Sequence, residues 1–116
     1  MWIFSRHGFF SVVVARDDQG KANPKRLNVR ARSLDQLKAL IARFPDLLVD
    51  CPSVCTTQSD YPHRIIVTKG LWRKVVDQLT AEIEYDNFKN EVARSGRSAS
   101  YLNALHRIWG VGRETR

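Results

Sequence analysis

The sequence predicts an α+β domain spanning residues 1–116. We expect a two-layer sandwich with a four-stranded, largely antiparallel sheet and helices on one face. The first fifteen residues are dense in aromatic and β-branched side chains. A strictly alternating segment follows at Leu27–Arg32, and four later segments carry apolar residues at helical spacing. The expected order is β-β-β-α-β-α-α-α, and it leaves the strand order open.

The chain opens with a predicted β-hairpin. Met1–Ser5 and Phe9–Ala15 have strand composition, and Arg6–Gly8 between them is short enough for a tight turn. Gly8 is free to take the positive φ that such a turn requires. Trp2 and Phe4 then share one face of the sheet, whereas Phe9 and Phe10 point to opposite faces.

A polar loop and a third strand follow the hairpin. Asp17–Arg26 contains Gly20 and Pro24, so we expect it to be an exposed loop. In Leu27–Arg32 the apolar and polar side chains alternate, which predicts one buried and one solvated face. The buried face carries Leu27, Val29 and Ala31, and the solvated face carries Asn28, Arg30 and Arg32.

Ser33 begins the first predicted helix. Ser33 and Gln36 have the spacing of a capping box, in which each side chain satisfies the other residue's backbone N–H, and Pro45 marks the helix end. The inward stripe is Leu34, Leu37, Ile41 and Phe44. Pro45–Pro62 has few regular signals and is predicted to be a long loop. Arg64–Thr68 is the expected fourth strand.

Three further helical segments are predicted after this strand. The second helix has the apolar stripe Leu71, Val75, Leu79 and Ile83. Asp86 is the expected N-cap of a short helix that carries Phe88 and Val92 one turn apart. Ser98 caps the last helix, which ends at Gly110 and Gly112. Its expected inward residues are Leu102, Leu105, Ile108 and Trp109.

The charge balance favours an anionic partner. Nineteen Lys and Arg residues oppose twelve Asp and Glu, which leaves a net charge of +7. Such a surplus attracts nucleic acid or an acidic protein, although a solvated basic surface without a specific partner is the simpler alternative. No apolar run is long enough for a membrane span, and the N-terminus lacks signal-peptide features. We therefore expect a cytoplasmic protein without a membrane partner.

Neither a metal nor a cofactor is expected. Cys51 and Cys55 are too far apart for a redox CxxC pair, and His63 could add only a third zinc ligand. The glycines form no phosphate-binding loop, and no hydrolase motif is present. His63 with Asp60 or Asp86 leaves a hydrolytic site open. We do not expect an enzyme, because no nucleophile and base have a recognisable spacing.

Three stretches carry a family resemblance. They are Met1–Phe4 with Gly8–Ser11 (MWIF, GFFS), Asp60–Arg64 (DYPHR), and Tyr85–Lys89 (YDNFK). They resemble a group of small, uncharacterised bacterial proteins of about this length. The group has no established activity or catalytic residues. The resemblance therefore implies a bacterial cytoplasmic protein and no particular chemistry.

Nucleic-acid binding on the solvated sheet face is the sharpest functional prediction. Cations beside the hairpin aromatics could bind phosphates while the rings stack on bases. The predicted contact residues are Arg30, Arg32, Tyr61, Arg64, Lys69, Tyr85, Asn87 and Lys89. The simpler interpretation places most hairpin aromatics in the core and explains Tyr85–Lys89 by helix capping. The alternative function is a host- or phage-derived adaptor or inhibitor that docks on an acidic protein. The oligomeric state is left open.

Overall fold

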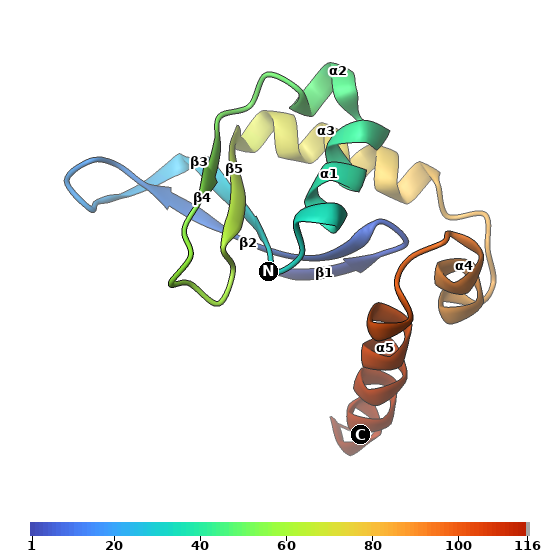
Figure 1. Cartoon of the computed structure of the whole chain (residues 1–116). Coiled ribbons are helices and arrows are strands. Elements are labelled where there is room, and N and C mark those ends of the chain that lie inside the picture. Colours follow the sequence, from blue (N-terminus) through green and yellow to red (C-terminus); the bar gives the residue numbers. More distant parts are fainter. Residues whose placement is uncertain (116) are drawn as a thin grey trace.

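The computed structural model describes residues 1–115 and has the predicted α+β class (Figure 1). All strand pairs are antiparallel, and the sheet order is β1-β2-β3-β5-β4. The strands are β1 (Trp2–Ser5), β2 (Gly8–Arg16), β3 (Ala22–Ala31), β4 (Ser53–Cys55) and β5 (His63–Thr68). The helices are α1 (Leu34–Arg43), α2 (Pro45–Leu48), α3 (Lys69–Ala81), α4 (Phe88–Arg94), α5 (Ala99–Gly112) and the 3₁₀ turn η1 (Arg113–Thr115).

The opening hairpin is confirmed. Phe4 pairs with Phe9 and Ile3 pairs with Phe10 across β1 and β2. Phe10 is fully buried in the main core, whereas Phe4 and Phe9 pack together on the opposite face. The consecutive residues Phe9 and Phe10 therefore belong to different hydrophobic clusters, as strand alternation requires.

The prediction of a loop over Asp17–Arg26 was wrong at its C-terminal end, because β3 begins at Ala22. Pro24 therefore lies inside a strand. The register between β2 and β3 shifts at Val14/Ala15, which leaves Pro24, Lys25 and Arg26 without a partner on β2. A proline is tolerated there because no ladder hydrogen bond needs its missing N–H.

The predicted four-stranded sheet is corrected to five strands. The segment expected to be irregular, Pro45–Pro62, contains both α2 and β4. The short strand β4 is exposed and pairs only with β5 at the edge of the sheet. Its three residues carry no periodic signal of their own, so tertiary pairing decides their conformation.

The Ser33 cap of α1 is confirmed, but the reciprocal half of the capping box is absent. The Ser33 hydroxyl accepts a hydrogen bond from the Gln36 backbone N–H. The Gln36 side chain instead accepts a hydrogen bond of 2.9 Å from the backbone N–H of Phe9. Gln36 therefore ties α1 to the opening hairpin, and Gly8 leaves the space that this contact needs.

Helices lie on both sides of the sheet, which corrects the expectation of one covered face. The main core joins α1, α2 and α3 to one face, with Phe10, Val29, Leu40, Ile65 and Val75 fully buried. A second cluster joins Val92, Tyr101 and Leu105 of α4 and α5 to Phe4 and Phe9 on the other face. Figure 1 shows α5 projecting from the body on the side opposite α1–α3.

Three other helix predictions need correction. Asn87, not Asp86, caps α4, because the Asn87 side chain accepts from the Asn90 backbone N–H. Helix α3 ends at Ala81, so Ile83 lies beyond it and is exposed. Helix α5 passes through Gly110, and its Ile108 and Trp109 are exposed rather than buried. The last turns of α5 project from the body, which leaves these side chains largely exposed (Figure 1).

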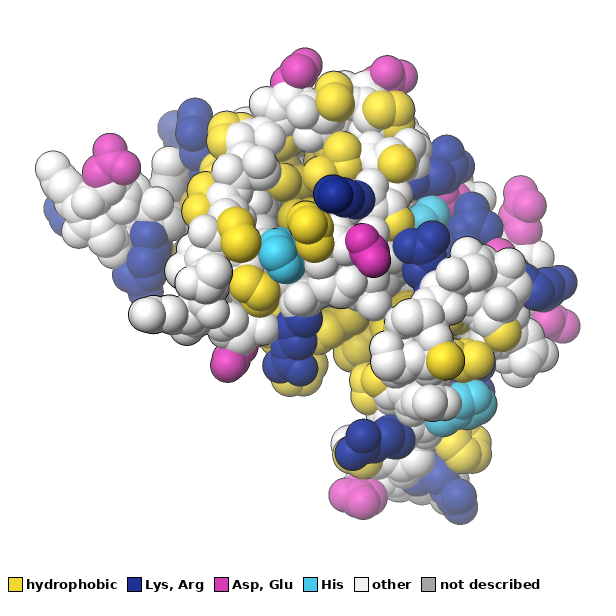
Figure 2. Space-filling view, in the orientation of Figure 1, with side chains coloured by type: hydrophobic (Ala, Val, Ile, Leu, Met, Phe, Trp, Pro, Cys, Tyr) yellow, Lys and Arg dark blue, Asp and Glu magenta, His cyan; other side chains and the backbone are white. Residues whose placement is uncertain are grey.

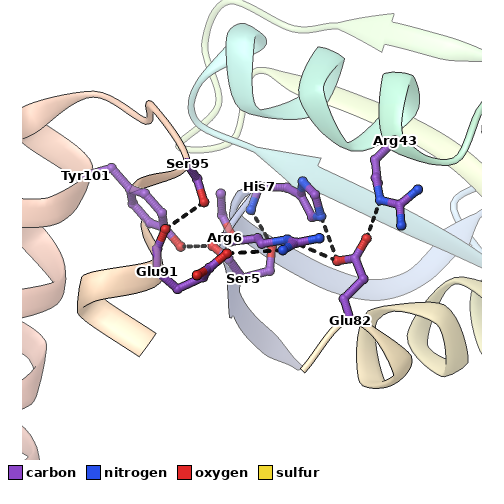
Figure 3. A network of polar contacts seen from close by, with 9 residues as sticks. Ser5, Arg6, His7, Arg43, Glu82, Glu91, Ser95 and Tyr101 are labelled. Atoms are coloured by element: carbon purple, nitrogen blue, oxygen red, sulfur yellow. Dashed lines mark hydrogen bonds and ion pairs between the residues drawn. The ribbon is translucent and has the colours of Figure 1, made fainter. Parts of the chain in front are cut away.

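Two polar contacts fasten α4 and α5 to the hairpin (Figure 3). Arg6 in the β1–β2 turn donates to Glu91 of α4 at 3.1 Å. The Tyr101 hydroxyl of α5 donates to the carbonyl of Ser5 at 2.7 Å. Burial raises the pKa of the Tyr101 hydroxyl despite this hydrogen bond. The contact therefore joins two neutral groups in a buried setting.

Removing that hydroxyl tests how α5 is held. We expect Tyr101→Phe to lower the free energy of unfolding by about 1–2 kcal/mol, because a buried hydrogen bond is lost while the ring remains. Urea denaturation followed by circular dichroism measures the change. Tyr85→Phe is the control, since its hydroxyl makes no hydrogen bond within residues 1–115. Equal unfolding curves for both variants would show that the Tyr101–Ser5 bond contributes nothing.

Candidate nucleic-acid interface

Three arginines lie together on the sheet face opposite the main core. Arg30 of β3 pairs in register with Arg64 of β5, and Arg32 follows directly after the last residue of β3, Ala31. Their inward neighbours Val29, Ala31 and Ile65 are fully buried. Strand alternation therefore points the side chains of Arg30 and Arg64 away from the core. Arg32 lies just beyond the end of β3, and its contacts with the rings of Tyr61 and Phe9 place its guanidinium on the same side. We call Arg30, Arg32 and Arg64 the arginine cluster.

Tyr61, in the loop before β5, forms the centre of this cluster. The Arg30 guanidinium carbon lies 4.7 Å from the centroid of the Tyr61 ring, and that of Arg32 lies 5.0 Å from it. Arg32 is also 6.0 Å from the ring of Phe9. These distances are typical of cation–π contacts, which hold a guanidinium in place without neutralising its charge.

Most N–H donors of the arginine cluster make no hydrogen bond within residues 1–115. Arg30 donates to the Ser11 hydroxyl at 2.7 Å, and Arg64 donates to the Ser59 hydroxyl and the Tyr61 carbonyl, each at 3.1 Å. The Nε atoms of Arg30 and Arg64 and the Oδ1 atom of neighbouring Asn28 are buried without a hydrogen-bond partner in residues 1–115. This face of the sheet therefore carries oriented polar groups that can still form hydrogen bonds with a ligand.

Carboxylates do not neutralise this cluster. Among residues 1–115, the ion pairs involve Arg6, His7, Arg43 and Arg94, and none involves Arg30, Arg32 or Arg64. Arg30 and Arg64 are directly opposite on adjacent strands, where like charges destabilise a sheet. An anion bound between them would remove that repulsion.

Aromatic side chains continue the surface from Tyr61 toward α5. The rings of Phe4 and Phe9 stack with centroids 4.5 Å apart, and Trp2 meets Phe9 edge-on at 5.8 Å. A hollow of about 390 Å³ lies between these rings and α5, with Arg32 at its rim. We call it the aromatic hollow. Figure 2 shows hydrophobic side chains in the angle between the body and the projecting helix.

The predicted contact residues separate into groups. Arg30, Arg32, Arg64 and Tyr61 come together as described. Lys69 begins α3 at the opposite end of β5 from Arg64. Tyr85, Asn87 and Lys89 lie around the start of α4, outside the arginine cluster. Asn87 serves as the α4 cap, and Lys89 lies over the Trp109 ring at 4.4 Å.

The sequence interpretation did not include the residues that hold the cluster. Ser11 and Ser59 accept from Arg30 and Arg64, and Ser11 is nearly fully buried. A serine between Phe10 and Val12 was a usable signal, because a polar residue on the solvated side of a strand can meet an outward arginine across the ladder. No comparable sequence pattern indicated that α5 forms one wall of the aromatic hollow.

The cysteine, histidine and carboxylate side chains do not form a metal site within residues 1–115. Cys55 and His63 pair across β4 and β5, but within residues 1–115 no three His, Cys, Asp or Glu side chains gather around a possible metal site. Burial, followed by the nearby charge of Asp50, raises the pKa of the Cys51 thiol. Of the helices described, none is long and apolar enough to cross a membrane.

Comparison with protein-family models, curated proteins and solved structures finds no match for this chain. The resemblance noted from the sequence therefore stays a prediction.

Proposed function

We propose that the protein is a non-enzymatic binding module that takes nucleic acid on the arginine cluster. The observation that carries this proposal is the set of three arginines around Tyr61 with no carboxylate partner within residues 1–115. Phosphate diesters fit this surface because guanidinium groups bind phosphate oxygens through two parallel N–H groups. Neighbouring rings offer surfaces on which bases stack.

The chemistry of the cluster favours binding over catalysis. Arginine stays protonated at any working pH, so it supplies charge and donors but no general base. Tyr61 is buried beneath two guanidinium groups, which keeps its ring as a stacking support. The fixed charge binds the phosphates of a nucleic acid, and flat apolar surfaces stack with its bases.

Fluorescence anisotropy of labelled single- and double-stranded DNA and RNA tests the proposal. We expect binding that persists near 150 mM salt and weakens linearly on a log–log plot, with a slope of about 0.7–0.9 per phosphate contact. Arg30→Ala with Arg32→Ala should weaken binding at least tenfold and reduce that slope, because phosphate contacts are lost. The same double variant should still unfold cooperatively, at a somewhat lower temperature because the buried Ser11 hydroxyl loses its hydrogen bond to Arg30.

A matched control keeps net charge constant. Arg73→Ala with Lys74→Ala also removes two positive charges, but from exposed positions of α3 on the other side of the sheet. This control should bind almost as tightly as the wild type. Equal losses in both double variants would mean that net charge alone attracts the strand and would contradict the site. Binding that disappears below 150 mM salt would contradict the function.

The exposed end of α5 favours a second candidate function, docking on an acidic protein. Ile108, Trp109 and Val111 are all exposed there. Lys89 and Arg113 both lie over the Trp109 ring, so the apolar surface has a cationic border. An apolar patch with this border suits a partner whose apolar anchors are flanked by Asp or Glu.

Its test is a pull-down from the native host followed by titration of the purified partner. Trp109→Ala should abolish capture of an acidic protein, while the Arg30/Arg32 double variant should retain it. The opposite dependence would assign the protein partner to the arginine cluster. Capture unaffected by Trp109→Ala would remove α5 from the candidate.

A further inference from the structure

The aromatic hollow has walls from two separate parts of the chain. Trp2, Phe4 and Phe9 form its sheet side, and Ala104 and Ile108 of α5 form the opposite side. Its volume of about 390 Å³ falls within the range of about 300–1,000 Å³ in which proteins bind small molecules. The small side chain of Ala104 leaves the space between the helix and the rings open.

The sheet side of the hollow is a rigid stacking surface. Phe4 and Phe9 are nearly parallel, with 10° between their planes, and Trp2 packs against Phe9 at 90°. Trp2 is nevertheless 68% exposed, so much of its indole is free for a ligand. A flat aromatic ligand gains most from such a surface, because ring stacking adds to the burial of apolar area.

The rim supplies a cation and hydrogen-bonding groups. Arg32 is exposed and is held over both Tyr61 and Phe9. Gln36 also lines the hollow, and its carbonyl oxygen accepts from Phe9 N–H. That bond identifies which end of the amide is oxygen and leaves the NH₂ group as a donor. A ligand with an anion next to a polar-edged ring matches this arrangement.

We propose that the aromatic hollow takes one unstacked nucleobase of a single-stranded nucleic acid whose adjacent phosphate lies on Arg32. This inference rests on the proposed function and specifies its substrate class. A base in a duplex is stacked between its neighbours, so it cannot enter a hollow behind the phosphate-binding side chain without being extruded. The α5 wall therefore gives the protein a preference for single strands, which the sheet face alone does not provide.

Two labelled strands with equal phosphate numbers separate base binding from phosphate binding. One is an eight-residue oligothymidylate, and the other is an eight-residue abasic strand. We expect wild-type protein to bind the thymidylate strand at least fivefold more tightly. It should also prefer the thymidylate strand to a duplex of the same sequence that is closed by a hairpin loop and stays double-stranded at the assay temperature. Fluorescence anisotropy at fixed salt measures all three affinities.

Filling the hollow provides the matching protein variant. Ala104→Leu should weaken thymidylate binding at least fivefold and leave abasic-strand binding unchanged. Asn103→Leu adds the same side chain at an exposed α5 position that does not line the hollow, and it should alter neither affinity. Circular dichroism and thermal unfolding confirm that both variants are folded.

The outcomes distinguish the two proposals. If the abasic and thymidylate strands bind equally, or Ala104→Leu has no effect, the base hollow is overturned while phosphate binding by the arginine cluster stands. Duplex binding as tight as single-strand binding also overturns it. If the wild type binds none of the three, both proposals fall. A thymidylate preference that Ala104→Leu removes and Asn103→Leu preserves supports the hollow.

Discussion

Gly8→Ala is expected to lower the free energy of unfolding by about 3 kcal/mol or more. Gly8 has a φ of +147°, which side-chain-bearing residues rarely adopt. A Cβ atom at this position would lie 2.6 Å from Cβ and 2.7 Å from Cγ of Gln36. Both backbone strain and overpacking therefore oppose the substitution.

Gly20→Ala separates these two causes. Gly20 also has a positive φ, +77°, but nothing lies within 4 Å of the Cβ position. Gly20→Ala should lower the free energy of unfolding by only about 1–2 kcal/mol, because it introduces backbone strain without a collision. Urea denaturation of both variants measures the difference. A cost for Gly8→Ala no greater than for Gly20→Ala would show that the close approach to Gln36 is unimportant.

The Gln36→Ala background provides a further check on Gly8. Truncation removes Cγ and the amide, so part of the collision with the new methyl group disappears. Gly8→Ala should then cost less than it does in the wild type, which a double-mutant cycle detects. Because Gln36 also holds the backbone of Phe9, the strained variant should disturb the aromatic hollow and weaken thymidylate binding.

Local patterns predicted the elements whose signals lie within a few residues. The alternation of Leu27–Arg32 predicted Arg30 on the outward face, where the register of β3 places it. Arg32 lies beyond the end of the strand and reaches the same side through its contacts with Tyr61 and Phe9. Ser33 and Ser98 were predicted to cap helices from their residue type and position. In the structure their hydroxyls accept hydrogen bonds from backbone N–H groups three residues ahead. Such contacts depend little on the rest of the chain, which is why they can be predicted.

Contacts between distant segments could not be predicted in this way. Strand β4 forms through pairing with β5, and the three residues Ser53–Cys55 contain no pattern that indicates it. The apolar stripe of α5 predicted burial for Ile108 and Trp109, but periodicity does not reveal that the helix extends past its support. Tyr61 was predicted as a contact residue because it lies close to Arg64 in the sequence. Its position between two arginines depends on the sheet register.

Glu82→Gln is the second substitution with a large expected effect, about 2 kcal/mol at pH 7. The Glu82 side chain is only 7% exposed, and three cationic or ionisable groups surround it (Figure 3). His7 Nε2 lies 2.9 Å from its carboxylate, Arg6 lies 3.4 Å away, and Arg43 donates a hydrogen bond to it. Glutamine has nearly the same size as glutamate, but it lacks the negative charge with which Arg6, His7 and Arg43 interact.

The expected loss depends on pH with a definite sign. Burial raises the pKa of Glu82, but the hydrogen bond and charge of His7, the hydrogen bond of Arg43 and the charge of Arg6 lower it by more. The pKa in the folded protein therefore lies below its usual value of about 4.5. A carboxylate with a depressed pKa stabilises the fold above its unfolded pKa, and this stabilisation is lost as pH falls through the folded pKa.

Urea denaturation of wild type and Glu82→Gln from pH 7 to pH 3 measures this dependence. The difference in unfolding free energy should be constant near neutrality and should shrink below about pH 4.5. Glu84→Gln removes a charge two residues away, at an exposed position with no ion pair among residues 1–115, and should have little effect at any pH. A difference that stays constant down to pH 3 would mean that the glutamine is destabilising by its shape.

The Glu82 contacts also link stability to the proposed base hollow. Arg6 bonds both Glu82, just after α3, and Glu91 of α4, so one side chain connects the main core to the unit that carries α5. Protonating Glu82 removes one of the two carboxylates that hold the Arg6 guanidinium, so the Arg6–Glu91 pair, which joins the hairpin to α4, loses part of its positioning. We therefore expect acid to increase amide exchange in α4 and α5 before the sheet unfolds, because their hydrophobic cluster is small and separate. Simultaneous loss of protection in the sheet and in α5 would contradict this order.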